Sequence, residues 1–152
     1  MRELGQWLSY ADRQKYVDQN LRPGCILYLK VDFTRPPKPK YVVYLGDSGS
    51  ASVLVFVVNS RVTPFKQCDT HLRSCHVVLK VADCPFLDHD SYIDCTEVIA
   101  MGRQHVLNEL ISDVTAIKGR LPETTRAAVV AAAGAAQTVA SLHKDFVRAA
   151  LA

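Results

Sequence analysis

The stretch YVVYLGDSGSASVLVFVVNS, residues 41–60, contains two apolar runs separated by a short polar segment. Both runs have the length of a β-strand and are rich in Val, Tyr and Phe, which favour strands. The SGS segment at 48–50 is typical of a turn. Alternation in the first run places Tyr41 and Val43 on one face and Val42 and Tyr44 on the other. The stretch therefore predicts two strands joined by a turn.

Further strands are predicted on both sides of this pair. The candidates are residues 25–33, 75–81 and 91–101. Short strands joined by turns, with no helices between them, favour an antiparallel sheet that closes or curls into a small barrel. The central part of the chain, residues 21–101, is therefore expected to be a β-barrel.

The sequence predicts helices at both ends of the chain. Near the N-terminus, apolar residues at near-helical spacing predict an amphipathic helix within residues 1–20 that ends at the RPG segment; they are Leu4, Trp7, Leu8, Ala11 and Val17. After Gly102 the apolar period becomes helical again, with Val106, Leu107, Leu110, Ile111 and Val114 on one face.

A last helix is predicted to begin at Pro122, which suits the first helical position, and to run to about Arg148. Gly134 inside it costs about 1 kcal/mol relative to Ala, so a break into two shorter helices is an open alternative. The chain is thus expected to be one α+β domain: a helix over 1–20, a barrel over 21–101 and a helical region over 102–152.

Composition narrows the class of protein. The 152 residues are 49% hydrophobic and 22% charged, as in an ordinary folded domain. The first residues are charged and lack an apolar core, so we expect no signal peptide. No apolar stretch is long enough to cross a bilayer. We therefore expect a cytoplasmic protein with no membrane partner, whose five cysteines are reduced.

A basic, proline-rich segment precedes the first of the two central strands. The sequence RPPKPK, residues 35–40, carries Arg35, Lys38 and Lys40 among three prolines. Prolines restrict the backbone, so the ammonium groups are held out at a low entropic cost. Such fixed cations suit a phosphodiester in its transition state. The other interpretation is a hairpin loop with solvated lysines.

The order of these segments resembles the barrel of the MazF/PemK (Kid) toxin family. The quoted residues are PGCILYLKVDF, KPKYVVYLGD, VLVFVVNSRVTPF, CHVVLK and LDHDSYIDCTEV, which together cover about residues 21–101. The resemblance implies an SH3-like barrel and an endoribonuclease that cleaves single-stranded RNA without a metal or cofactor. It also implies a cognate antitoxin protein as a partner and a homodimer.

The resemblance also implies site residues. The family places an arginine just before its second strand, whereas this chain has Lys40 there, which gives up the bidentate guanidinium contact with phosphate. Ser60 matches the Ser or Thr that ends the third strand, with Arg61 beside it. Asp90 and Ser91 match the region where the family places an Asp or a Gln/Ser pair.

RNA cleavage needs a base for the 2′-hydroxyl, an acid for the departing 5′-oxygen and cations around the phosphorus. The hypothesis assigns Lys40, with Lys38 or Arg61, to the charge. Asp90 or His89 is the base, and Ser60 positions the phosphate. Arg35, Lys38, Arg61 and Ser91 are the predicted substrate-binding residues.

Several alternatives stay open. The chain is also interpretable as a non-catalytic SH3-like module that binds nucleic acid or a protein segment, or as a barrel whose terminal helices occupy the antitoxin site. Tyrosines near the basic loop could stack on bases or pack the barrel: Tyr28, Tyr41, Tyr44 and Tyr92. A zinc site is disfavoured because the spacing of its potential ligands is unlike that of paired knuckles; these ligands are Cys68, His71, Cys75 and His76.

Overall fold

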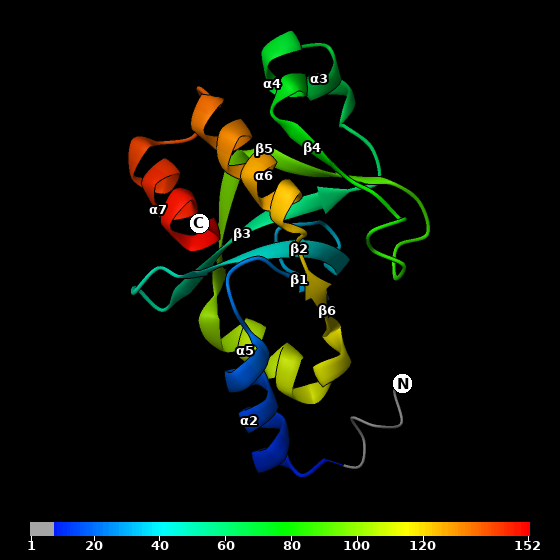
Figure 1. The fold of residues 1–152 in the computed structure, drawn as a ribbon. Helices are drawn as coiled ribbons and strands as arrows, with labels where there is room; N and C mark the ends of the chain where they lie inside the picture. Colours follow the sequence, from blue (N-terminus) through cyan, green and yellow to red (C-terminus); the bar gives the residue numbers. More distant parts are fainter. Residues whose placement is uncertain (1–7) are drawn as a thin grey trace.

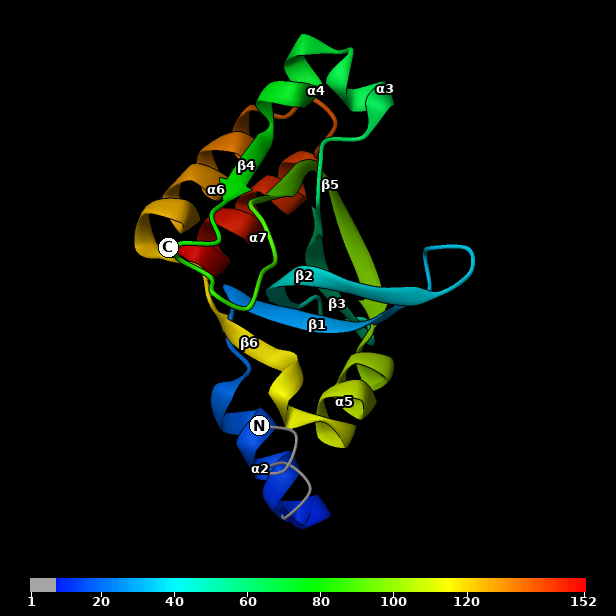
Figure 2. The same cartoon turned by 90° about the vertical axis from the view of Figure 1, so that its right-hand side faces the viewer.

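A computed structural model describes residues 8–152, which form one sheet with helices on both faces (Figure 1; Figure 2). Leu4 and Trp7 of the predicted N-terminal helix lie outside the described residues. The elements are α2 (Tyr10–Asn20), β1 (Cys25–Val31), β2 (Lys38–Asp47), β3 (Ser52–Asn59), α3 (Pro64–Gln67), α4 (Thr70–Ser74), β4 (His76–Leu79), β5 (Ser91–Gly102), α5 (Arg103–Ser112), η1 (Val114–Ala116), β6 (Ile117–Arg120), α6 (Glu123–Ala135) and α7 (Ser141–Leu151).

The six strands run in the order β4-β5-β3-β2-β1-β6, and every neighbouring pair is antiparallel. Within the described residues β4 and β6 each have one strand neighbour, so the sheet is open. Of the expected sheet that closes or curls into a barrel, closure is therefore wrong, whereas the α+β class and the antiparallel pairing are confirmed. The sheet does not need to close on itself, because helices cover its two faces.

The central strands explain this arrangement. In β3, six consecutive residues from Val53 to Val58 are buried, and in β2 the buried run extends from Val42 to Gly46. A strand that faces solvent on one side alternates between apolar and polar residues, whereas a strand covered on both sides does not. The continuous Val-rich run of β3 thus reflects two hydrophobic cores, one on each face.

The first core lies between the sheet and helices α6 and α7. It contains Val43 and Phe56 from the sheet together with Val129 of α6 and Val147 of α7. The second core lies on the opposite face, against α2 and α5, and includes Val42, Tyr44, Val17, Val106 and Leu110. Figure 2 shows the two helix pairs on opposite sides of the strands. The predicted alternation of residues 41–44 is confirmed.

The predicted last helix, from Pro122 to about Arg148, consists of two helices, as in the alternative with a break near Gly134. The region 102–152, expected to be helical, also contains the strand β6. α6 ends at Ala135, and Ala136 has an extended backbone with ψ of 118°. Ala136 and Val139 in the connection are buried against Cys75. The connection between α6 and α7 is therefore packed against the end of α4, just before β4.

The sequence did not predict four of the elements: α3, α4, η1 and β6. The short helices α3 and α4 lie between β3 and β4, and β6 adds a strand to the edge of β1.

None of the helices within residues 8–152 combines the length and apolarity needed to cross a bilayer.

Candidate functional site

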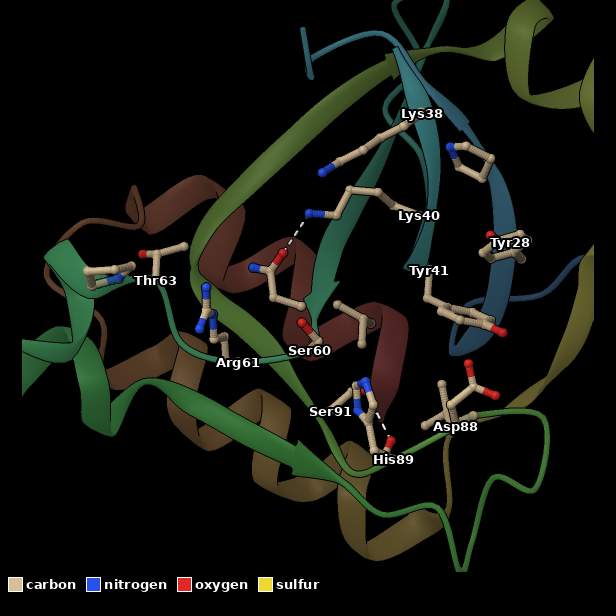
Figure 3. A pocket seen from close by; sticks show the side chains of 15 residues that line it. Tyr28, Lys38, Lys40, Tyr41, Ser60, Arg61, Thr63, Asp88, His89 and Ser91 are labelled. Carbon is tan, nitrogen blue, oxygen red and sulfur yellow. Dashed lines mark hydrogen bonds between the residues drawn. The ribbon is translucent and has the colours of Figure 1, made fainter. Parts of the chain in front are cut away.

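An open groove of about 500 Å³ lies where β2 begins and β3 ends, opposite the segment that leads into β5 (Figure 3). Three separate parts of the chain supply its walls, and antiparallel pairing brings the first two together. The lining residues are Tyr28, Lys38, Pro39, Lys40, Tyr41, Val58, Asn59, Ser60, Arg61, Thr63, Pro64, Leu87, Asp88, His89 and Ser91.

The basic segment is held by strand pairing. β2 begins at Lys38, earlier than the predicted start at residue 41, and Pro39 lies opposite Lys30 of β1. The pairing of β2 with β3 starts only at Tyr41, so Pro39 lies beyond the end of the β3 ladder. A proline is tolerated there because no backbone donor is required on that side. The two lysines are consequently part of a strand and not of a mobile loop.

Lys40 is the most constrained cation of the groove. Its Nζ donates a hydrogen bond of 2.6 Å to Asn59 Oδ1 on the neighbouring strand. Partial burial lowers the pKa of Lys40 below its ordinary value, and the nearby charge of Lys38 lowers it further, while Asp94 acts in the opposite direction. A lysine in this environment gives up its proton more readily than a solvated one.

The opposite wall presents an imidazole and a carboxylate. His89 is exposed, and its Nδ1 lies 2.9 Å from the backbone carbonyl oxygen of Asp90. A carbonyl only accepts hydrogen bonds, so Nδ1 is the donor and the Nε2 atom of a neutral ring keeps its lone pair. Asp88 is exposed beside it and lines the same groove. This wall therefore offers acceptors that face the cations of β2.

Most of the predicted site residues meet in this groove: Lys38, Lys40, Ser60, Arg61, His89 and Ser91 line it. Ser91 is buried, and its hydroxyl donates to the His89 carbonyl at 3.3 Å, which supports the loop. Arg35 is not among the lining residues and is exposed in the β1–β2 connection.

Asp90 is also outside this groove. Its Oδ1 accepts a hydrogen bond of 2.8 Å from the Val81 amide, so the carboxylate ties two parts of the loop together. It lines an adjoining depression with Ser60 and His89. In this placement the carboxylate caps a turn of the loop.

Sequence reasoning missed Asn59, Thr63 and Asp88 as lining residues. Asp88 lies two residues before the predicted Asp90, in a segment without regular structure, where no periodicity indicates which carboxylate points inward. Asn59 could have been identified from register, because the pairing of Tyr41 with Val58 makes Lys40 and Asn59 neighbours.

An aromatic cluster forms one end of the groove. Tyr28 and Tyr41 have ring centroids 4.5 Å apart, and Tyr41 and Phe86 have centroids 5.7 Å apart. The hydroxyl of Tyr41 donates to the Phe86 carbonyl oxygen at 3.2 Å, and burial raises its pKa. Tyr44 is buried in the second core and does not reach the groove. Tyr28 therefore presents an exposed aromatic ring beside the cations.

The potential zinc ligands do not converge. Cys68 is exposed, and Cys75 is buried with its Sγ 3.9 Å from His71 Nε2. His71 Nε2 accepts a hydrogen bond of 3.0 Å from the Gln137 amide, and His76 points elsewhere, toward Asp94. In the part of the chain that the structure describes, no three His, Cys, Asp or Glu side chains form a group suited to a metal.

Comparison with known proteins adds little to this geometry. No protein-family model matches the chain, and no curated protein sequence matches it. The Mycobacterium tuberculosis toxin MazF-mt6 is similar in structure over 76% of this chain and 98% of its own, at 15% sequence identity and a TM-score of 0.48. At that level the likeness assigns neither an activity nor site residues to this chain.

Proposed function

We propose that the groove binds single-stranded RNA and cleaves it without a metal, as a toxin-like endoribonuclease. The observation that carries this proposal is the meeting of Lys38, Lys40 and Arg61 with His89 in one open groove. Cations on one wall suit a phosphodiester, and an imidazole with a free nitrogen on the other suits proton transfer.

In the proposed reaction the 2′-oxygen of RNA attacks the adjacent phosphorus, and the bond from phosphorus to the 5′-oxygen breaks. His89 Nε2 takes the proton of the 2′-hydroxyl. Lys40, whose pKa is lowered, supplies a proton to the departing 5′-oxygen, while Lys38 and Arg61 face the non-bridging oxygens. The products are a 2′,3′-cyclic phosphate and a 5′-hydroxyl. DNA lacks the nucleophile and is not cleaved.

A labelled RNA of mixed sequence and its all-deoxy counterpart test the proposal. We expect the wild-type protein to cleave the RNA alone, and His89→Ala to reduce the rate by about 10²-fold or more, as is typical for loss of a general base. Lys40→Ala should cause a loss of comparable size. The matched control is Lys15→Ala, which removes the same charge from the exposed surface of α2. Equal rates in the wild type and both groove variants would refute the assignment.

A non-catalytic module is the second candidate function. Lys40 favours this candidate. An arginine at this position could bind phosphate through two hydrogen bonds, which a lysine cannot do, and Lys40 already donates a hydrogen bond to Asn59. This candidate predicts that RNA and DNA single strands bind the groove and that neither is cut. A gel-shift assay run beside the cleavage assay separates the two functions.

The toxin role extends the proposal to the cell and to partners. Induced expression in a bacterial host should arrest growth and deplete bulk messenger RNA, and His89→Ala should abolish both effects. We also propose a homodimer and a cognate antitoxin as partners, on the family resemblance of the sequence. Light scattering on the purified chain tests the homodimer, because a dimer has twice the chain mass of 16.8 kDa.

A further inference from the structure

A second, smaller hollow of about 490 Å³ adjoins the end of β3 and the short helices α3 and α4. It is separate from the groove but shares Arg61 with it. The residues that line it are Arg61, Val62, Gln67, Arg73, His76 and Tyr92. The hollow contains two guanidinium groups and an imidazole, and no carboxylate belongs to its lining.

The charge of this hollow is uncompensated. Within residues 8–152 neither Arg61 nor Arg73 forms an ion pair. The nearest buried acid, Asp94, already accepts hydrogen bonds from Lys66 and Thr96. An anion that enters the hollow therefore meets cations that have no other partner.

His76 also lines the hollow, but its polar atoms are turned to the protein. Its side chain is only 2% exposed, and its Nδ1 lies 2.8 Å from the Leu72 carbonyl oxygen, to which it must donate. Its buried Nε2 forms no hydrogen bond within residues 8–152 and faces Asp94 Oδ1 at 3.6 Å. The attraction of the hollow for an anion therefore comes from Arg61 and Arg73.

The hollow and the groove are joined along one surface. The depression between them shares Ser60, Arg61, His89 and Tyr92 with one or the other, and Val81 and Asp90 complete its lining. An RNA strand that leaves the groove across this depression comes within reach of Tyr92 and Arg73. Cations together with aromatic rings are what single strands bind.

We propose that this hollow binds a backbone phosphate of the RNA strand that occupies the groove, a few nucleotides from the cleaved bond. Arg61 and Arg73 contact the phosphate oxygens, and Tyr92 stacks on a base between the two sites. This inference rests on the proposed function and adds a second phosphate subsite to it.

Fluorescence anisotropy with non-cleavable RNAs tests the subsite. The probes are a dinucleotide and a decanucleotide of RNA, both with 2′-O-methyl groups at every position so that no 2′-hydroxyl can attack and neither is cut. We expect Arg73→Ala to weaken decanucleotide binding about tenfold and to reduce the slope of log affinity against log salt by about one. Dinucleotide binding should be unchanged. Arg73 is exposed, so this variant should fold.

Two comparisons make the result specific. Lys15→Ala, with the same loss of charge on α2, should bind both probes as the wild type does. Tyr92→Ala should also weaken only the longer probe, by about tenfold, because a stacked base is lost. If Arg73→Ala binds the decanucleotide as tightly as Lys15→Ala while the wild type binds both probes, the subsite is refuted and the groove proposal stands. If the wild type binds no RNA, both are refuted.

Discussion

Lys66 Nζ donates a hydrogen bond of 2.5 Å to Asp94 Oδ2, and this contact joins helix α3 to the buried strand β5. Asp94 Oδ1 accepts two further bonds, from the amide and the hydroxyl of Thr96. Burial by itself raises the pKa of Asp94, but these bonds outweigh it and hold the pKa below its ordinary value. Helix α3, which precedes the helix α4 that carries Arg73, is thus anchored to the sheet by one buried carboxylate.

Asp94→Ala should lower the free energy of unfolding by about 3 kcal/mol, because it leaves the buried donors of Thr96 and the partly buried ammonium group of Lys66 without their acceptor. Urea denaturation followed by circular dichroism measures the loss. The control is Glu97→Ala: Glu97 Oε2 lies 4.0 Å from the same Lys66 Nζ, but its side chain is 65% exposed. We expect the control to change stability by less than about 0.5 kcal/mol. Similar losses in both variants would contradict the central role of Asp94.

Low pH should destabilise the protein through the same carboxyl group, that of Asp94. The pKa of an unfolded Asp is about 3.9, and the pKa of Asp94 in the folded protein lies below its ordinary value. Such a carboxyl stabilises the fold at pH values above the unfolded pKa. This contribution is lost as the pH falls through the folded pKa. Stability of the wild type should therefore decline below about pH 4 more steeply than that of Asp94→Asn. Parallel curves of unfolding free energy against pH would show that Asp94 does not carry this dependence.

Two glycines should respond to alanine in opposite directions. Gly46 has φ of +136°, and a Cβ there would lie 3.3 Å from Phe146 Cζ of α7. Gly46→Ala should destabilise the protein by about 1–3 kcal/mol through strain and a disturbed contact. Gly134 in the last turn of α6 has no atom within 4 Å of such a Cβ. Gly134→Ala should stabilise it by about 0.5 kcal/mol. Thermal unfolding of both variants, with opposite shifts in Tm, checks the pair.

The strands were predictable because their chemistry is local. The apolar runs of β2 and β3 and the polar turn between them are visible in the sequence, and alternation placed Tyr41 and Val43 together correctly. Whether the sheet closes into a barrel could not be predicted from local sequence, because it depends on which faces of the sheet the helices cover. The sequence does carry a signal for this, since the unbroken buried run Val53–Val58 is typical of a strand covered on both sides.

The site was predictable where it lies on paired strands and not where it lies on a loop. Lys38, Lys40, Ser60 and Arg61 occur at adjacent strand ends, so pairing brings them into one groove. The segment before β5 has no period, and neighbouring residues there point in different directions. His89 faces the groove, whereas the carboxylate of Asp90 turns to the Val81 amide. The hollow beside Arg73 depends on α3 and α4, which were not predicted at all.

The environment of Lys40 yields a prediction that needs no substrate. Burial and the charge of Lys38 lower the pKa of Lys40. Lys38→Ala removes the second cause and should move the Lys40 pKa upward, toward its ordinary value. A titration of the lysine side chains by NMR, with Lys40→Arg to assign the signal, measures the change. Lys15→Ala is the control and should leave the Lys40 pKa as it is in the wild type.

Asp90 distinguishes a catalytic carboxylate from a structural one. If its carboxylate only accepts the Val81 amide, asparagine should replace it, because the Asn Oδ1 atom accepts the same bond. We therefore expect Asp90→Asn to cleave RNA at close to the wild-type rate. Asp90→Ala should lose about 1 kcal/mol of stability through the loss of one hydrogen bond. Initial rates on labelled RNA and a urea titration of each variant provide the two measurements.

The alternative makes the opposite prediction for the same pair. A general base contributes about 10²–10⁴-fold, and an amide cannot take a proton, so a catalytic Asp90 would make Asp90→Asn as inactive as Asp90→Ala. His89→Ala is the reference for the loss of a base. Asp88→Asn is the companion variant, because Asp88 lines the groove beside His89 whereas Asp90 does not. If Asp90→Asn cleaves RNA as slowly as His89→Ala does, Asp90 is the general base. The loop must then rearrange when RNA binds.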